Sequence, residues 1–245
     1  MNDLYNTSTA KHYQAYRPSL HQNILKSVFR KSKIFDQVLD VGCGVGHSSV
    51  ALLEYGRNIT GLEISAAMLE KAKTHKNIQY ICGSLTQYPL PSSHYDLITF
   101  AGSLFYAKSQ ALLNEVMRIS KEEAIILVYD FQLDLSPILS KLNLILPESN
   151  YEHDTDFSDL QASFLHLRET YVSPTSFICS PSEIIHVLFA EKPIASAINQ
   201  KYPKSGEFQY HWNQLFGEED LKLRAELNYN KYLVLKRPKS QSPNH

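Results

Sequence analysis

The feature that most constrains this fold is a short apolar segment running straight into closely spaced glycines, Val38-Leu39-Asp40-Val41-Gly42-Cys43-Gly44-Val45-Gly46. Glycine has no Cβ, so a turn of this kind lets a ligand approach the backbone closely. A helix is expected over about residues 47–55, and its first N–H groups would face whatever lies over the turn. A strand, a glycine turn and a helix in this order indicate a cofactor-binding α/β unit.

The first 130 residues alternate between short apolar runs and amphipathic stretches, a rhythm typical of a parallel sheet with crossover helices. Farther along, Ser180-Pro181-Ser182-Glu183 has the pattern of a capping box with proline at the first helical position, which predicts a helix start. The strands expected are 38–41, 59–63, 78–82, 95–100, 124–129 and 229–235. The helices expected are 18–31, 47–55, 65–73, 110–119 and 136–145, with another beginning near 180.

Two acidic residues narrow the choice of cofactor. Glu63 ends the strand after the turn, about 20 residues on, where an acid hydrogen-bonds the hydroxyls of a ribose. Dinucleotide folds favour the spacing G-x-G-x-x-G, but here the third glycine comes one residue early. Asp40 lies two residues before the first glycine, where a carboxylate would repel a pyrophosphate and attract an ammonium or sulfonium group. The electrostatics therefore favour S-adenosylmethionine.

Several further motifs follow in order. The segment 39–46 resembles motif I of class I S-adenosylmethionine-dependent methyltransferases, and residues 61–72 look like the second strand and following helix of that family. The segments 83–85, 88–91 and 95–99 resemble its third and fourth strands. Residues 13–18 look like the first helix of the small-molecule branch that includes trans-aconitate methyltransferase-like proteins. The resemblance covers about residues 10–131 and is loose beyond them.

The resemblance implies a cofactor site and a fold. Ser84 departs from the family pattern, because an acid usually holds the adenine amino group at that position. The fold implied is a Rossmann-like three-layer α/β sandwich, with a seven-stranded, mostly parallel sheet and one antiparallel strand near the C-terminus. The implied cofactor-binding residues are Tyr13, Arg17, Asp40, Gly42, Cys43, Gly44, Gly46, Glu63, Ile64, Met68, Ser84, Leu85, Ala101 and Ser103.

No residue stands out as a catalytic base. His186, His166 and Tyr171 are weak candidates, since each could equally fill space in the core. No metal site is expected, because the best local cluster, at 153–156, is better interpreted as surface charge. Methyl transfer from a sulfonium needs a base only if the acceptor is protonated at neutral pH.

Bulk properties fit a single domain in a reducing compartment. Three scattered cysteines, an unremarkable N-terminus and no long apolar run favour a cytoplasmic protein without membrane spans. A net charge of −1 offers no field for nucleic acid. Within one domain spanning 1–245, we expect an N-terminal lid helix at about 1–31, a cofactor-binding core at 32–131, a substrate cover at 132–222 and a final strand at 223–237.

The sequence thus predicts a methyltransferase acting on a small-molecule acceptor, as a monomer or homodimer. O-methylation of a carboxylate or hydroxyl is favoured over N- or C-methylation, but no motif identifies the acceptor. The alternatives are a non-catalytic S-adenosylmethionine-binding or regulatory protein, a nucleic-acid methyltransferase and a NAD-dependent oxidoreductase. The last of these would have to tolerate a pyrophosphate beside Asp40.

Overall fold

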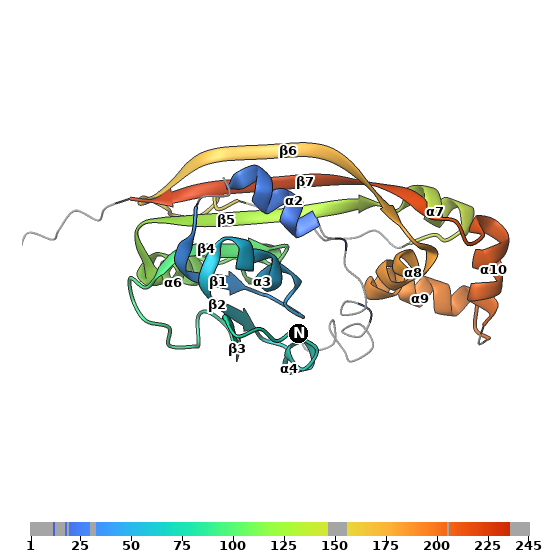
Figure 1. The fold of residues 1–245 in the computed structure, drawn as a ribbon, viewed down its shortest axis with the longest axis horizontal. Coiled ribbons are helices and arrows are strands. Elements are labelled where there is room, and N and C mark those ends of the chain that lie inside the picture. Colours follow the sequence, from blue (N-terminus) through green and yellow to red (C-terminus); the bar gives the residue numbers. More distant parts are fainter. Residues whose placement is uncertain are drawn as a thin grey trace, which may run out of the picture.

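The structure is a computed structural model that describes residues 12, 18, 20–29, 33–146, 156–204 and 206–235. Those residues contain one seven-stranded sheet, in the order β3-β2-β1-β4-β5-β7-β6 (Figure 1). Strand β7 runs antiparallel to both of its neighbours, and all the other adjacent pairs are parallel. This confirms the predicted mostly parallel sheet with one antiparallel strand near the C-terminus.

The sheet has a short half and a long half. The short strands are β1 (Phe35–Val41), β2 (Gly56–Glu63), β3 (Ile78–Cys82) and β4 (Tyr95–Ala101). The long strands are β5 (Ser120–Asp134), β6 (Leu165–Cys179) and β7 (Leu221–Val234). In Figure 1 the long strands extend past the short ones and lead to a group of helices at one end of the molecule.

Helices cover both faces of the short half and make the three layers. One face packs against α2 (Leu20–Val28), α3 (His47–Ala51) and the 3-10 turn η1 (Leu52–Glu54), around the buried side chains of Ile24, Leu52 and Leu97. The other face packs against α5 (Leu104–Ala107) and α6 (Gln110–Ile119). α6 presents Leu113 and Val116 to the sheet, which matches the helical spacing of its apolar residues.

A third core lies where the long strands end. It joins α7 (Ser136–Lys141), α8 (Pro181–Ala190), α9 (Lys192–Lys201) and α10 (Glu207–Phe216), and Trp212 is fully buried in it. The capping box at the start of α8 is formed as predicted, with Ser180 and Glu183 each bonded to the backbone of the other. None of the helices in the described residues has the length and apolar character that crossing a bilayer requires.

Two predicted helices are shorter in the structure. The helix expected at 65–73 is α4 (Ala66–Leu69), capped by Ser65. The chain leaves the helix there, and the backbone N–H of Lys73 donates to the carbonyl of Val45 in the glycine turn. The helix expected at 136–145 ends at Lys141, because Asn143 adopts a left-handed conformation that closes it.

Strand β6 was not predicted from the sequence. This strand forms one edge of the sheet and lies within the region predicted to be a substrate cover. Its side chains are mostly exposed or half-buried, and the apolar run that marks a buried strand is missing. Pro174 lies in this strand, and proline is tolerated in a strand at the edge of a sheet.

Candidate functional site

The glycine turn follows β1, and its shape depends on glycine at each of its three glycine positions. Gly42, Gly44 and Gly46 all have positive φ, which side-chain-bearing residues rarely adopt. A Cβ on Gly42 would lie 2.4 Å from the Cβ of Ser103, and one on Gly46 would lie 2.1 Å from Tyr80 Oη. The N–H groups of Gly42 and Cys43 both donate to the carbonyl of Leu62, which ties the turn to the end of β2.

Glu63, the last residue of β2, is held against this turn. Its Oε2 accepts the N–H of Gly44 at 3.1 Å, and its Oε1 accepts the N–H of Ser65 at 2.8 Å. Burial raises the pKa of the Glu63 carboxyl, and the nearby charge of Asp40 raises it further, while the backbone hydrogen bonds lower it. A carboxylate has about four lone-pair positions, so two backbone donors leave acceptor capacity for hydroxyls of a ligand.

Asp40 lies beneath the turn, and its carboxylate is fully buried. Its Oδ2 accepts the hydroxyls of Ser48 and Ser49, both at 2.6 Å, and its Oδ1 accepts the hydroxyl of Thr99 at 3.0 Å. Burial raises the pKa of this carboxyl, and the three hydroxyl donors oppose that rise. Asp40 therefore joins the start of α3 to β4 and is not part of a cavity wall.

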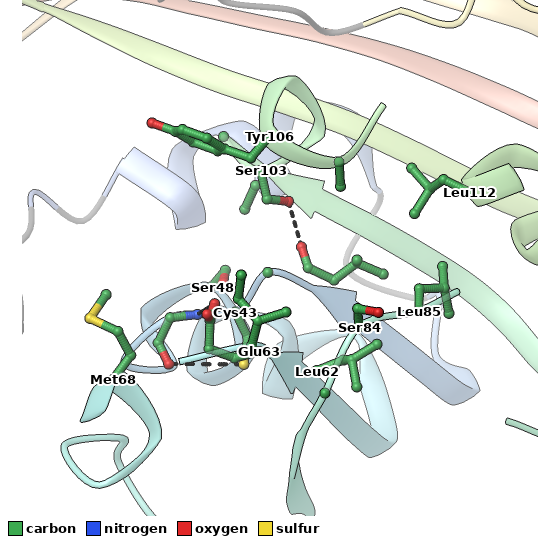
Figure 2. A pocket seen from close by; sticks show the side chains of 18 of the residues that line it. Cys43, Ser48, Leu62, Glu63, Met68, Ser84, Leu85, Ser103, Tyr106 and Leu112 are labelled. Carbon is green, nitrogen blue, oxygen red and sulfur yellow. Dashed lines mark hydrogen bonds between the residues drawn. The ribbon is translucent and has the colours of Figure 1, made fainter. Parts of the chain in front are cut away.

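A cavity of about 400 Å³ opens where β1, β2, β3 and β4 end, within the range of small-molecule sites. In Figure 2 Tyr106 and Ser103 lie on one side of it, with Met68, Glu63 and Ser84 across from them. All the described residues that line it fall between His21 and Leu112, so none comes from the region predicted as a substrate cover. The thiol of Cys43 is also in the wall, and burial raises its pKa far above the usual range.

Most of the residues predicted to bind cofactor line this cavity. Two that do not are Asp40, beneath the turn, and Gly46, which packs against Tyr80. Tyr13 and Arg17 lie outside the described residues. Those in the wall are Gly42, Cys43, Gly44, Glu63, Ile64, Met68, Ser84, Leu85, Ala101 and Ser103.

The three weak catalytic candidates do not line the cavity. His166 and Tyr171 are on the edge strand β6, where Tyr171 stacks on Tyr229 at 5.0 Å between ring centroids. His186 is on α8, with its Nδ1 3.0 Å from Nδ1 of His12. Among the described residues, no group of three or more His, Cys, Asp or Glu side chains is arranged to hold a metal ion.

His21 was not among the predicted site residues. It lines the cavity from the first turn of α2, and its Nδ1 lies 3.1 Å from the hydroxyl of Tyr129 on β5. The helix pattern was clear, but a histidine beside a buried helix face looks like any core residue. His47, Ser48, Thr86 and Tyr106 also line the cavity and were not predicted to do so.

Comparison with known sequences gives a consistent result. Residues 38–123 match the family described as methyltransferase domain. The chain is 27% identical to the uncharacterized methyltransferase YcgJ of Bacillus subtilis, over 52% of this chain and 54% of that protein. It is 36% identical to the malonyl-[acyl-carrier protein] O-methyltransferase of Pectobacterium atrosepticum, over 37% of this chain and 36% of that protein. The chain spans about half the length of the curated relatives that it matches first.

Solved structures share the fold over most of the chain. A protein from Anaeromyxobacter dehalogenans, described as a candidate type II methyltransferase, superposes with a TM-score of 0.63 at 14% identity, over 91% of this chain and 98% of that one. The crystal structure of YcgJ from Bacillus subtilis superposes with a TM-score of 0.54 at 17% identity, over 89% of this chain and 99% of that one. Identities this low support the shared fold and nothing finer.

Proposed function

We propose, from the match of residues 38–123 to the methyltransferase domain family, that this chain is an S-adenosylmethionine-dependent methyltransferase that methylates an oxygen atom of a small-molecule acceptor. The observation that carries the proposal is the position of Glu63, whose carboxylate is fixed by two backbone N–H groups and faces the cavity. A buried acid at the end of the second strand is suited to a ribose diol.

Residues suited to the other parts of the cofactor line the rest of the cavity. Gly42 and Gly44 line the cavity beside the place proposed for the methionine part. Ile64 and Met68 offer apolar contact for the adenine, with Ser84 and Leu85 beside it. Ala101 and Ser103 lie at the end of β4, where we propose the sulfonium would be held.

We propose that Asp40 acts through the turn and does not touch the cofactor. Its three hydroxyl partners hold the start of α3, including Ser48 in the cavity wall. Tyr13 and Arg17 remain proposed cofactor contacts, on the resemblance alone. Membership of the small-molecule branch that includes trans-aconitate methyltransferase-like proteins is also a proposal that rests on the resemblance alone.

S-adenosylmethionine supplies an activated methyl group, so the protein's contribution is mainly to place the acceptor and exclude water. An oxygen acceptor is favoured by the names of the relatives. One is the malonyl-[acyl-carrier protein] O-methyltransferase, and another is a ubiquinone biosynthesis O-methyltransferase of Coxiella burnetii, 37% identical over 25% of this chain and 29% of that protein.

Isothermal titration of the purified chain with S-adenosylmethionine, and separately with NADH, tests the cofactor. Micromolar binding of S-adenosylmethionine that Glu63→Ala abolishes is the expected result. Binding of NADH in its place, or binding indifferent to Glu63, would contradict the proposal. A chain that binds S-adenosylmethionine but releases no S-adenosylhomocysteine with any oxygen acceptor would instead be the non-catalytic alternative.

A further inference from the structure

Another cavity lies at the opposite end of the parallel strands from the glycine turn. Its volume is about 410 Å³, within the range of small-molecule sites, and no described residue lines both cavities. Lys33 precedes β1, and Ile125 pairs with Leu97 near the start of β4, so this cavity lies where the parallel strands begin. We call it the basal cavity. Its described walls come from the end of α2, from Lys33 and from strands β5, β6 and β7.

Apolar side chains form the floor of the basal cavity. Val28 and Phe29, at the end of α2, line it together with Ile125 of β5 and Leu233 of β7, which are cross-strand partners. α2 lies across β7 (Figure 1), where Tyr229 is part of the core beneath the helix. Leu233 is four residues farther along β7 and therefore on the same face of the sheet. The apolar face thus continues beyond the helix and can receive an alkyl group.

The described walls of the basal cavity carry three basic side chains and no acidic one. Arg168 is the extra residue of a β-bulge, because the pairing of β6 with β7 shifts register between Leu167 and Glu169. A bulge turns a side chain away from its regular direction. Arg168 makes no hydrogen bond or ion pair with any residue that the structure describes. Lys33 has its Nζ 5.1 Å from the centroid of the Phe35 ring, a contact that leaves its charge in place.

The third cation, Lys231, is already paired. It donates to the carboxylate of Glu169, which also accepts the hydroxyl of Tyr229 at 2.6 Å. An ammonium group has three donors, so Lys231 keeps N–H groups for a further acceptor. The C-terminal end of α2 carries a partial negative charge, but Lys33 and Arg168 each carry a full positive charge. The balance of charge at the basal cavity therefore favours an anion.

A ligand of the basal cavity has to match both the apolar floor and the basic rim. S-adenosylmethionine carries two cations, so the rim does not favour it. Residues 236–245 follow β7 and carry three basic side chains and no acidic one, so charge disfavours them in the same way. We propose that the basal cavity binds an amphipathic anion, with an alkyl chain on the floor and a carboxylate or phosphate head held by Arg168 and Lys33. This site is separate from methyl transfer and does not depend on the proposed function.

Titration calorimetry of the full chain with decanoate tests the proposal. Decanoate should bind, while acetate, which lacks the alkyl chain, and decyltrimethylammonium, which reverses the charge, should not. Arg168→Gln should weaken decanoate binding about three- to tenfold, since solvent moderates the charge-assisted hydrogen bond of an exposed arginine. Arg57→Gln is the matched control, because Arg57 is exposed, pairs with Asp36 and does not line the cavity. It should change decanoate affinity less than twofold.

A second arm separates a free amphiphile from a membrane lipid. Binding of free decanoate that Arg168→Gln weakens identifies a soluble ligand. Sedimentation with phosphatidylglycerol vesicles but not with phosphatidylcholine vesicles, lost in Arg168→Gln, identifies a lipid with an anionic head.

The proposal is overturned if neither decanoate nor the anionic vesicles bind. It is also overturned if decyltrimethylammonium binds equally well, or if Arg168→Gln binds as the wild type does. An unchanged thermal midpoint establishes that Arg168→Gln is folded. Neither arm contains S-adenosylmethionine, so failure here leaves the proposed function standing, and failure of the proposed function leaves this result standing.

Discussion

The short and the long half of the sheet differ in how the side chains of their strands are buried. The C-terminal parts of β1 and β4, residues 38–41 and 97–100, are buried at every position and mostly apolar. Strands β6 and β7 form an antiparallel ribbon: in β7 buried positions alternate with more exposed ones, and in β6 half-buried positions alternate with exposed ones for much of the strand. The cavity at the glycine turn belongs entirely to the first half, as far as the described residues show, while the second half ends in the helical cluster around Trp212.

The two halves differ in where backbone conformation and buried charge are tightly constrained. In the first half, strand ends, turns and carboxylates lie within a few ångströms of a ligand cavity, so positive φ angles and buried charges are retained there. In the second half, Gly206 and Gly217 also have positive φ, but a Cβ on either would meet no atom within 4 Å. Stability in that half comes from apolar burial. The predictions below separate these two sources of constraint.

The largest effect on stability is expected in the second half. Trp212→Ala should lower the free energy of unfolding by about 3–5 kcal/mol, because it removes a fully buried side chain and leaves a cavity. Trp212→Phe is the matched variant and should cost less, since the buried Nε1 has no hydrogen-bond partner among the residues that the structure describes. Chemical denaturation measures both.

If the two halves are energetically separable, Trp212→Ala should leave S-adenosylmethionine affinity within about twofold of the wild type. Loss of binding in a variant that remains folded would contradict that separation. The helical cluster would then support the cofactor site directly.

The same contrast explains what the sequence could predict. Gly42 and Glu63 were found because a turn needing positive φ and an acid ending the next strand are local patterns, readable from a few neighbouring residues. β6 was not found, since an edge strand is half exposed and its partner β7 lies over 40 residues later. His21 is placed by its contact with Tyr129, 108 residues away. No local pattern encodes such a contact.

A second prediction compares two strained glycines. Gly42→Ala should cost about 2–4 kcal/mol of stability and disrupt cofactor binding, because the new Cβ would lie 2.4 Å from Ser103 Cβ on a backbone with φ of +72°. Gly206→Ala, at φ +79° with no atom nearby, should cost only about 1–2 kcal/mol and leave binding intact. Thermal denaturation and titration calorimetry provide both readouts, and equal losses in the two variants would refute the contrast.

A third prediction isolates charge at the cavity. Glu63→Gln keeps the size of the side chain but removes its charge, and should weaken S-adenosylmethionine binding by about 1.5–3 kcal/mol, roughly 10- to 150-fold. Asp96→Asn is the matched control. That carboxylate pairs with Lys121 near the start of β4, and its replacement should cost less than about 1 kcal/mol of stability without altering binding. Similar affinity losses in the two variants would remove Glu63 from the site.

The smallest effect is a dependence on pH, and its sign follows from burial. Burial raises the pKa of the Glu63 carboxyl in the folded chain, so folding disfavours its charged form. The stability that this carboxyl contributes is fully present below its unfolded pKa and is lost as the pH rises through its folded pKa. Glutamine does not titrate, so Glu63→Gln should gain Tm relative to the wild type as the pH rises from about 4 to 7. Asp40 titrates in both proteins, and its own raised pKa largely cancels in this difference. A Tm difference that becomes more negative over the same range would mean that the backbone donors of Gly44 and Ser65 outweigh burial. In that case the Glu63 carboxylate would be favoured by the fold even before a cofactor binds.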